Sequence, residues 1–382
     1  MNPVEGGPVE GVIQLSTINR KSGHTIEILC LDKPGSPWLQ KLGTGIHAVG
    51  PTRLGKYGFA WALTRWLRQN AQNYDCVIVN GIWTYNAFGA WLGLRSGKTP
   101  YVVFTHGMLD PWFKRAYPLK HLKKWLYWPW GLYPVLRDAA AIIFTCDMER
   151  KLARESFWLY EAREIVINYG TAGIPQSDQN YRPAFFAAHP TLVGKRLFLF
   201  LGRVNPKKGP DLLIQSIAEL QRLGEWDPAT MILVMAGPSD STYAAQLKTL
   251  ARSEEIESSL YWTGMIQGDP KWGLMQAAEV FVLPSHQENF GIAVAEALSC
   301  GTPVLITHPV NISPEIAADG AGIVGEDTLA GCVAMIRRWL ALSPPAQSAM
   351  RQQSVATFRA RYTAEQSASD LIHAIRTLNS LF

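Results

Sequence analysis

The chain has 382 residues, of which 47% are hydrophobic and 18% are charged, a composition typical of a soluble globular protein of two or three domains. Its formal net charge of +5 is too small to indicate a nucleic-acid-binding protein by itself. Five scattered cysteines without C-x-x-C spacing fit neither a disulfide framework nor a zinc site and indicate a reducing cytoplasm. No apolar run reaches the roughly 18–20 residues that span a bilayer. The N-terminus does not have the pattern of a signal sequence, so any membrane contact is expected at the surface.

Short β-branched or aromatic runs alternate with helix-length segments along the chain. Near-continuous apolar runs indicate strands covered on both faces by helices, and their alternation with helices predicts parallel doubly wound sheets. The predicted strands are 24–31, 74–81, 100–107, 140–146, 164–170, 196–203, 231–237, 260–265, 280–285, 303–307 and 322–325. Eleven strands are many for one such sheet, so we predict an α/β protein with two Rossmann-like domains.

The chain begins with a glycine loop, a predicted helix and then a strand. A doubly wound domain normally has a strand before such a loop, yet only Met1 to Glu5 precede Gly6 and Gly7. Either the sheet lacks its first strand or the natural start lies upstream of Met1, and we favour the second. Mass spectrometry of the natural N-terminus would decide between them.

Four regions follow from this alternation. We predict an N-terminal Rossmann-like domain over residues 1–170, a linker over 171–195 rich in turn-forming residues, and a C-terminal Rossmann-like domain over 196–355. An amphipathic helix is expected within 356–382, and its crossing back to the first domain is left open.

His106 follows the strand of "YVVFTHG". Ligands of open α/β sheets bind outside the carboxyl ends of the strands, which makes His106 a candidate site residue. A single histidine is more often structural, so both interpretations stay open.

Residues 111–137 contain six Lys or Arg, eight aromatic residues and no acid. Three interpretations remain: an aromatic core under a solvated lysine face, contact with an anionic membrane, and, least favoured, binding of single-stranded nucleic acid. The candidate membrane or acceptor residues are Lys114, Arg115, Lys120, Lys123, Lys124 and Trp125.

Cations gather at the predicted start of a helix in "GRVNPKKGPDLL". Pro210 is well suited to open that helix, so Arg203, Lys207 and Lys208 crowd the positive end of its dipole. Such a cluster is unfavourable unless an anion joins it. We expect Arg203 and Lys208 to bind a diphosphate.

Two glutamates occupy "ENFGIAVAEALS", which is predicted as a turn followed by a helix. Glu288 lies on the turn before the helix, where the helix dipole favours a negative charge. Its role is therefore either purely structural or the binding of a ligand. Glu296 is the only charge of the helix, and its neighbours Ile292 and Cys300 offer no ion pair. A buried carboxylate needs hydrogen-bond donors, for which the hydroxyls of a ribose or sugar are natural candidates.

Several chemistry-bearing motifs are absent from the sequence. It has no D-x-D pair, no Walker loop and no G-x-G-x-x-G, so a metal cofactor is not expected and a dehydrogenase is disfavoured.

Together, "ENFGIAVAEALSCGTPV", "GRVNPKKG" and the "GGP" near the start resemble the E-x7-E signature, the cationic loop and the N-terminal glycine loop of retaining glycosyltransferases of family four. The resemblance covers most of the chain and implies the GT-B fold, with two Rossmann-like domains facing across a cleft. It implies that the N-terminal domain, 1–170, binds the acceptor and that the C-terminal domain, 196–355, binds the nucleotide-sugar. The segment "THGMLDPW" and the basic stretch after it resemble enzymes of bacterial cell-surface polysaccharide synthesis. Two departures are "INYGTAGIP" in place of N-G-V-D and the missing first strand.

The resemblance implies residue roles. Glu288 would hold donor-sugar hydroxyls, Glu296 the ribose, and Arg203 and Lys208 the diphosphate, while His106 would contact the sugar. The full set implied for catalysis or donor binding is Gly6, Gly7, His106, Gly202, Arg203, Lys208, Gly264, Met265, Glu288, Asn289, Phe290, Gly291, Ile292 and Glu296.

The expected function is a retaining, metal-independent hexosyltransferase, with glucose from UDP-glucose the best guess and a lipid-linked or polysaccharide acceptor. No cofactor and no nucleic-acid partner are expected, and the protein would be cytoplasmic or peripheral on the inner membrane face. The alternatives are a GDP-mannose-dependent mannosyltransferase, a GT-B sugar-nucleotide epimerase and, least favoured, a non-catalytic nucleotide-sugar or membrane-binding module. The sequence does not identify the donor base, sugar, acceptor or oligomeric state.

Overall fold

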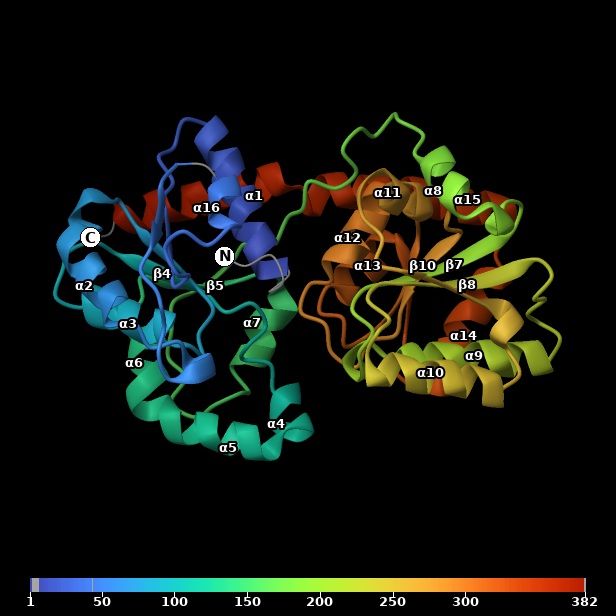
Figure 1. The fold of residues 1–382 in the computed structure, drawn as a ribbon, viewed down its shortest axis with the longest axis horizontal. Helices are drawn as coiled ribbons and strands as arrows, with labels where there is room; N and C mark the ends of the chain where they lie inside the picture. Colours follow the sequence, from blue (N-terminus) through green and yellow to red (C-terminus); the bar gives the residue numbers. More distant parts are fainter. Residues whose placement is uncertain (2–6, 43, 381–382) are drawn as a thin grey trace. The chain divides into compact units, whose positions relative to one another are not determined.

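The computed structural model describes residues 1, 7–42 and 44–380. The chain divides into two compact units, which are described separately below: unit 1 comprises 1–170 and 364–382, and unit 2 comprises 171–363. All nine pairs of neighbouring strands in the described sheets run parallel, as the near-continuous apolar runs predict. Figure 1 shows the elements of both units.

Unit 1 contains two sheets, one with the order β1-β2 and one with the order β3-β4-β5-β6. Its strands are β1 (Ile28–Cys30), β2 (Ile46–Ala48), β3 (Val77–Asn80), β4 (Tyr101–Phe104), β5 (Ala141–Phe144) and β6 (Glu164–Val166). Its α-helices are α1 (Gly7–Lys21), α2 (Trp61–Asn70), α3 (Tyr85–Leu94), α4 (Trp112–Ala116), α5 (Pro118–Tyr127), α6 (Tyr133–Arg137), α7 (Asp147–Ala153) and α16 (Ala364–Asn379). The shorter helical turns are η2 (Leu39–Leu42), η3 (Gly55–Tyr57), η4 (Ala71–Asn73) and η5 (Trp128–Leu132).

The four-stranded sheet of unit 1 is covered on both faces. One face packs against apolar side chains of α2, α3, η5 and α6, including Trp128, which is fully buried. The other face packs against α16, whose Leu371, Ile375 and Leu378 lie on the sheet. Figure 1 shows α16, drawn in red, with the blue α1 in the same unit. The last helix of the chain therefore completes the core of the first unit.

The strand β2 has no counterpart in the sequence prediction. It has three residues, all half-buried, and such a short strand carries little periodic pattern. Among the described residues the two sheets of unit 1 share no strand pairing, and a cavity of about 530 Å³ is lined by residues of both, including Cys30 and Val79. The expectation of a strand before Gly6 concerns residues outside the described ranges.

Unit 2 has one six-stranded sheet with the order β12-β11-β10-β7-β8-β9. Its strands are β7 (Arg196–Leu201), β8 (Met231–Ala236), β9 (Leu260–Gly264), β10 (Val280–Leu283), β11 (Val304–Thr307) and β12 (Gly322–Gly325). Its α-helices are α8 (Arg182–Ala188), α9 (Pro210–Arg222), α10 (Thr242–Ser253), α11 (Gly268–Ala277), α12 (Ile292–Ser299), α13 (Ser313–Asp319), α14 (Leu329–Leu340) and α15 (Pro344–Arg361). The shorter turns are η6 (Pro190–Leu192), η7 (Pro206–Lys208) and η8 (Glu257–Ser259).

The segment expected as a linker, 171–195, belongs to unit 2 and carries α8. Phe185 of α8 is fully buried, and Gly273 of α11 lets the two helices approach, since a Cβ there would lie 2.3 Å from the carbonyl oxygen of Tyr181. The seven-residue helix is too short to show a clear helical period.

Candidate donor site

The centre of the unit 2 sheet has the geometry of a ligand site. From β7 the chain proceeds outward to β8 and β9, and it then returns to place β10 on the other side of β7. Because all these strands are parallel, the loops after β7 and β10 leave the same edge of the sheet in opposite directions. This switch point is where open α/β sheets bind their ligands.

The two loops at the switch point are fastened to each other. The amide N–H of His286 donates to the carbonyl oxygen of Lys207 at 2.9 Å. Gly209 has a φ of 62°, and a Cβ at this position would lie 2.1 Å from the carbonyl oxygen of Pro284. Only glycine permits so close an approach of the backbones. The lysines of one loop are thereby held against the glutamate of the other.

Lys208 and Glu288 form an ion pair across the switch point, with Nζ and Oε2 2.6 Å apart and side chains only 15% and 17% exposed. The backbone of Glu288 is fixed on its other side, where its N–H donates to Pro309 and its carbonyl accepts from Asn311. Burial alone would raise the pKa of Glu288, but the surrounding cations, led by Lys208, hold that pKa below its ordinary value. Glu288 is therefore ionised at neutral pH.

Two further cations lie near Glu288 besides Lys208. Lys207 and Arg203 also act on this carboxylate, and Arg203 is exposed. Helix α9 starts directly after the loop that follows β7, and α12 starts directly after the loop that follows β10. The first N–H groups of a helix have no intrahelical acceptor. Cations and helix N-termini together form an anion-binding site.

Glu296 lies buried on α12, and its partner comes from another helix. Lys271 of α11 places Nζ 2.5 Å from Oε1 of Glu296. The same ammonium lies 4.6 Å from the ring centroid of Trp272. Sequence reasoning examined only neighbours on the same helix and missed Lys271, because the contact joins residues 25 positions apart.

The remaining predicted donor-site residues lie at strand ends or at the start of α12. Gly202 follows β7, Gly264 ends β9, and Met265 beyond it is 63% exposed. Asn289 and Phe290 precede α12, and the Phe290 ring is buried against Tyr362. Gly291 is the N-cap of α12, with a φ of 75°, and Ile292 is its first residue.

In unit 1, His106 lies at the carboxyl end of β4. It has a φ of 48°, its ring stacks on Phe104, and Nε2 lies 3.0 Å from Oδ1 of Asn80. Burial lowers the pKa of His106, so the ring is neutral at pH 7. Gly7 is the first residue of α1, whereas Gly6 lies outside the described residues.

The basic stretch of unit 1 combines a buried and an exposed part. Trp128 is buried and stacks on Phe157, which agrees with the aromatic-core interpretation for that residue. Lys124 lies with Nζ 4.3 Å from the ring centroid of Trp83, and burial, with help from Lys120, lowers the pKa of Lys124 to about 8. The other predicted contact residues, Lys114, Arg115, Lys120, Lys123 and Trp125, are exposed.

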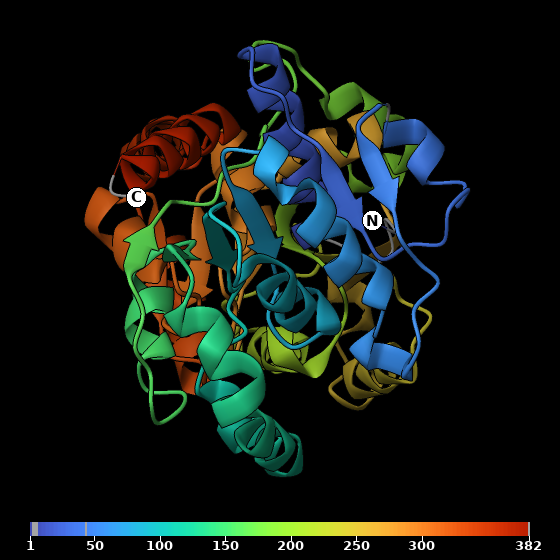
Figure 2. The same cartoon turned by 90° about the vertical axis from the view of Figure 1, so that its left-hand side faces the viewer.

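Sequence reasoning missed the apolar side of this surface. Leu119, Leu122 and Leu126 of α5 are 77%, 54% and 59% exposed and lie at the spacing of one helix face. Figure 2 shows α4 and α5, in teal, projecting from the body of unit 1. In the described part of the chain, no helix is both long and apolar enough to cross a bilayer.

A doubly wound sheet with a cationic cradle at its switch point is typical of proteins that bind phosphorylated ligands. Two family models match this chain: "Glycosyl transferase 4-like domain" over residues 6–170 and "Glycosyl transferases group 1" over 182–357. Since the two models together account for most of the chain, it belongs to the group 1, family-four-like glycosyltransferases. The resemblance inferred from the E-x7-E and cationic-loop motifs is thereby confirmed.

Similar proteins agree with this assignment. The D-inositol 3-phosphate glycosyltransferase of Kineococcus radiotolerans is 29% identical over 202 residues, which are 52% of this chain and 46% of that protein. The chain spans about half the length of these curated relatives.

Solved structures share the fold over nearly the whole chain. Sucrose-phosphate synthase from Thermosynechococcus elongatus has a TM-score of 0.76 and 18% identity, covering 99% of this chain and 94% of that one. The HepE protein of Anabaena, solved in complex with UDP and glucose, has a TM-score of 0.75 and 15% identity, covering 98% and 97%. The predicted GT-B fold class is confirmed.

Replacing Lys208 by Met should lower kcat/KM by on the order of 10²–10³-fold, because one cation of the anion site is removed. The pKa of the buried Glu288 should then rise, since burial remains while its nearest cation is lost. In the wild type, ionised Glu288 stabilises the fold at pH values above the ordinary carboxyl pKa of the unfolded chain. This stabilisation is lost as the pH falls through the lowered pKa of Glu288 in the folded protein. The loss of unfolding free energy between pH 7 and pH 4, measured by urea unfolding, should therefore be smaller in the variant than in the wild type. Lys195→Met, at the opposite end of β7, is the matched control and should retain full activity.

Replacing Lys271 by Met should lower the free energy of unfolding by about 1–3 kcal/mol, because the buried carboxylate of Glu296 loses a donor. The double variant Lys271→Met with Glu296→Gln should recover part of this loss, as a neutral amide tolerates the site better. Thermal and urea unfolding measure both effects. An unchanged unfolding curve for the single variant would mean that the pair carries no stability.

Proposed function

We propose that this protein is a retaining, metal-independent glycosyltransferase that transfers a hexose from a nucleotide-sugar to a lipid-linked or polysaccharide acceptor in cell-surface polysaccharide synthesis. Glucose from UDP-glucose is the donor that we favour. The observation that carries the proposal is the buried Lys208–Glu288 pair at the switch point, surrounded by further positive charge. The choice of donor is supported by the Anabaena HepE protein, whose structures include a complex with UDP-glucose.

The proposed chemistry places the catalytic work at the leaving group. When the bond between the anomeric carbon and the diphosphate breaks, negative charge increases on the phosphate oxygens. Arg203, Lys208 and the N–H groups at the start of α12 stabilise that charge without a metal ion. The acceptor attacks from the face that the diphosphate leaves, and a leaving phosphate oxygen takes the acceptor's proton. No carboxylate of the protein becomes covalently bound to the sugar.

The two glutamates have separate proposed roles at the donor. Glu288 is ionised and fixed on both sides of its backbone, so it can accept hydrogen bonds from sugar hydroxyls. Glu296 accepts from the ribose hydroxyls, while Lys271 fixes its carboxylate and compensates its burial. His106, neutral at pH 7, contacts the donor sugar without adding a charge beside the developing oxocarbenium ion.

A nucleotide and donor screen tests the proposal. UDP should raise the melting temperature more than GDP or ADP, and UDP-glucose should be hydrolysed slowly without acceptor and transferred with it. EDTA should leave turnover unchanged, because protein cations neutralise the diphosphate. If GDP raises the melting temperature selectively and GDP-mannose is turned over, the donor is GDP-mannose and the protein is a mannosyltransferase. Interconversion of the donor sugar without transfer would identify an epimerase and contradict the proposal.

We also propose that α5 rests on an anionic membrane, which would make the protein peripheral on the cytoplasmic face. Its exposed Leu119, Leu122 and Leu126 suit the acyl boundary, and the neighbouring Lys120 and Lys123 suit acidic headgroups. A lipid-linked acceptor would be presented at such a surface.

Flotation with vesicles containing anionic lipid tests this surface. Lys120→Glu with Lys123→Glu should reduce binding by at least on the order of 30-fold, since each lysine removed near the surface costs roughly 1 kcal/mol. Leu119→Ser with Leu122→Ser should weaken binding to neutral and anionic vesicles alike. Lys124→Gln is the matched control with a smaller expected effect, because this ammonium lies against Trp83. Undiminished flotation of both double variants would reject α5 as the contact.

A further inference from the structure

A buried glutamate of unit 1 has no role in the proposed mechanism so far. Glu149 lies on α7 and is 3% exposed. Its Oε1 accepts from the hydroxyl of Thr105 at 2.6 Å and from the N–H of Gly107 at 2.5 Å. Its Oε2 accepts from the N–H and the hydroxyl of Thr145 at 2.7 and 2.6 Å. Among the described residues, these four donors converge on one carboxylate.

These hydrogen bonds surround His106. Thr105 precedes it and Gly107 follows it, so Oε1 of Glu149 holds a side-chain hydroxyl before the histidine and a backbone N–H after it. Oε2 reaches Thr145, which follows the neighbouring strand β5. The carboxylate therefore fastens the ends of β4 and β5 to each other at the place where the histidine leaves the sheet.

The conformation of His106 requires such a constraint. Its φ of 48° lies in the left-handed region, which is unfavourable for a residue with a Cβ and persists where the surroundings hold it. The hydrogen bond to Asn80 orients the ring, but it does not fix the backbone. Glu149 does fix it, because it binds the backbone N–H of Gly107 directly after the histidine and the side chain of Thr105 directly before it.

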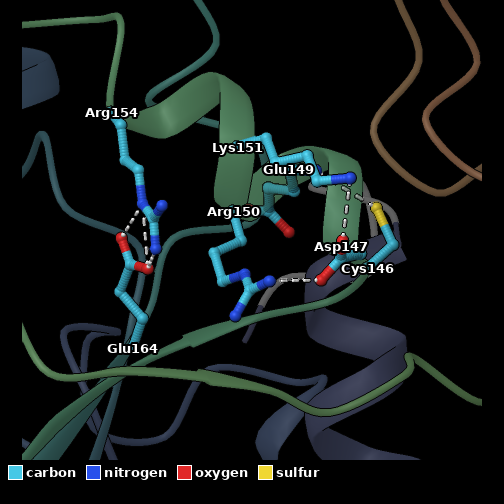
Figure 3. A network of polar contacts seen from close by, with 7 residues as sticks. All are labelled: Cys146, Asp147, Glu149, Arg150, Lys151, Arg154 and Glu164. Atoms are coloured by element: carbon cyan, nitrogen blue, oxygen red, sulfur yellow. Dashed lines mark hydrogen bonds and ion pairs between the residues drawn. The ribbon is translucent and has the colours of Figure 1, made fainter.

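The other charged residues of α7 are engaged elsewhere. Figure 3 shows Arg150 and Lys151 paired with Asp147 on the exposed side of the helix, and Arg154 paired with Glu164. The N–H of Glu149 itself contacts the sulfur of Cys146 at the N-cap. Glu149 differs from Asp147, Arg150 and Lys151 in being buried and directed at the strand ends.

We propose that Glu149 is a positioning residue that holds His106 in the conformation required for sugar transfer. This inference rests on the proposed function for its effect on turnover, but not for its effect on the histidine. Each oxygen of Glu149 accepts one backbone N–H, from Gly107 or from Thr145. A glutamine in either orientation would turn its NH₂ group against one of them, so only a carboxylate satisfies both.

Glu149→Gln is the decisive variant. It should lower kcat by on the order of 10- to 100-fold and change the KM for the donor by less than about threefold. The reason is that the variant loses the position of His106 beside the sugar, while the groups that bind the donor are unchanged. The negative charge of Glu149 raises the pKa of His106 against the lowering by burial, so the imidazole of the variant should titrate at lower pH. NMR of the histidine rings measures this without substrate, which separates failure of the positioning role from failure of the proposed transferase activity.

Asp147→Asn, on the same helix, is the matched control and should leave kcat and the His106 titration unchanged. If Glu149→Gln does not fold, Thr105→Val removes one donor on the histidine side and should produce a smaller loss of kcat with shifted His106 resonances. A folded Glu149→Gln variant with wild-type kcat would overturn the proposal. So would one whose His106 resonances and titration match the wild type while its activity falls.

Discussion

The ion pair between Lys208 and Glu288 is the interaction on which the donor site depends. It joins two loops that leave neighbouring strands in opposite directions, and each charge compensates the partial burial of the other. Because Lys208 lies within a larger group of cations, the pair is not electrically balanced. Arg203, which is exposed, adds a further cation beside the pair, so the bond that fixes the loops lies next to a positive charge that suits phosphate.

The two units use buried carboxylates in a similar way. In unit 2, Glu288 lies between the loop after β7 and the residues that follow β11. In unit 1, Glu149 lies between the ends of β4 and β5. Parallel strands offer no hairpin to connect their carboxyl ends, so those ends must be connected by side chains or loops. A carboxylate, with two oxygens that each accept several donors, suits this task.

Much of this organisation is encoded in local patterns. All eleven strands expected from the sequence correspond to observed strands, because buried parallel strands are continuous apolar runs. The cationic loop and the E-x7-E spacing indicated the donor site, since a strand–turn–helix segment places its turn at the sheet edge. Lys271 and Glu149 could not be predicted in this way. Each acts on a residue far away in sequence, and only the packing of α11 on α12 and of α7 beside β4 brings them together. The exposure of Leu119 could not be predicted from the sequence either, because an apolar helix face usually packs against the core.

The place of α16 affects the order in which the protein can fold during synthesis. Unit 1 contains residues from both ends of the described chain, whereas unit 2 is one continuous segment. Leu371, Ile375 and Leu378 cover the sheet side chains of Val102 and Ile143. Until those last residues leave the ribosome, one apolar face of the first unit remains exposed to solvent. The second unit meanwhile has all of its strands, so the domain that is translated first is the one completed last.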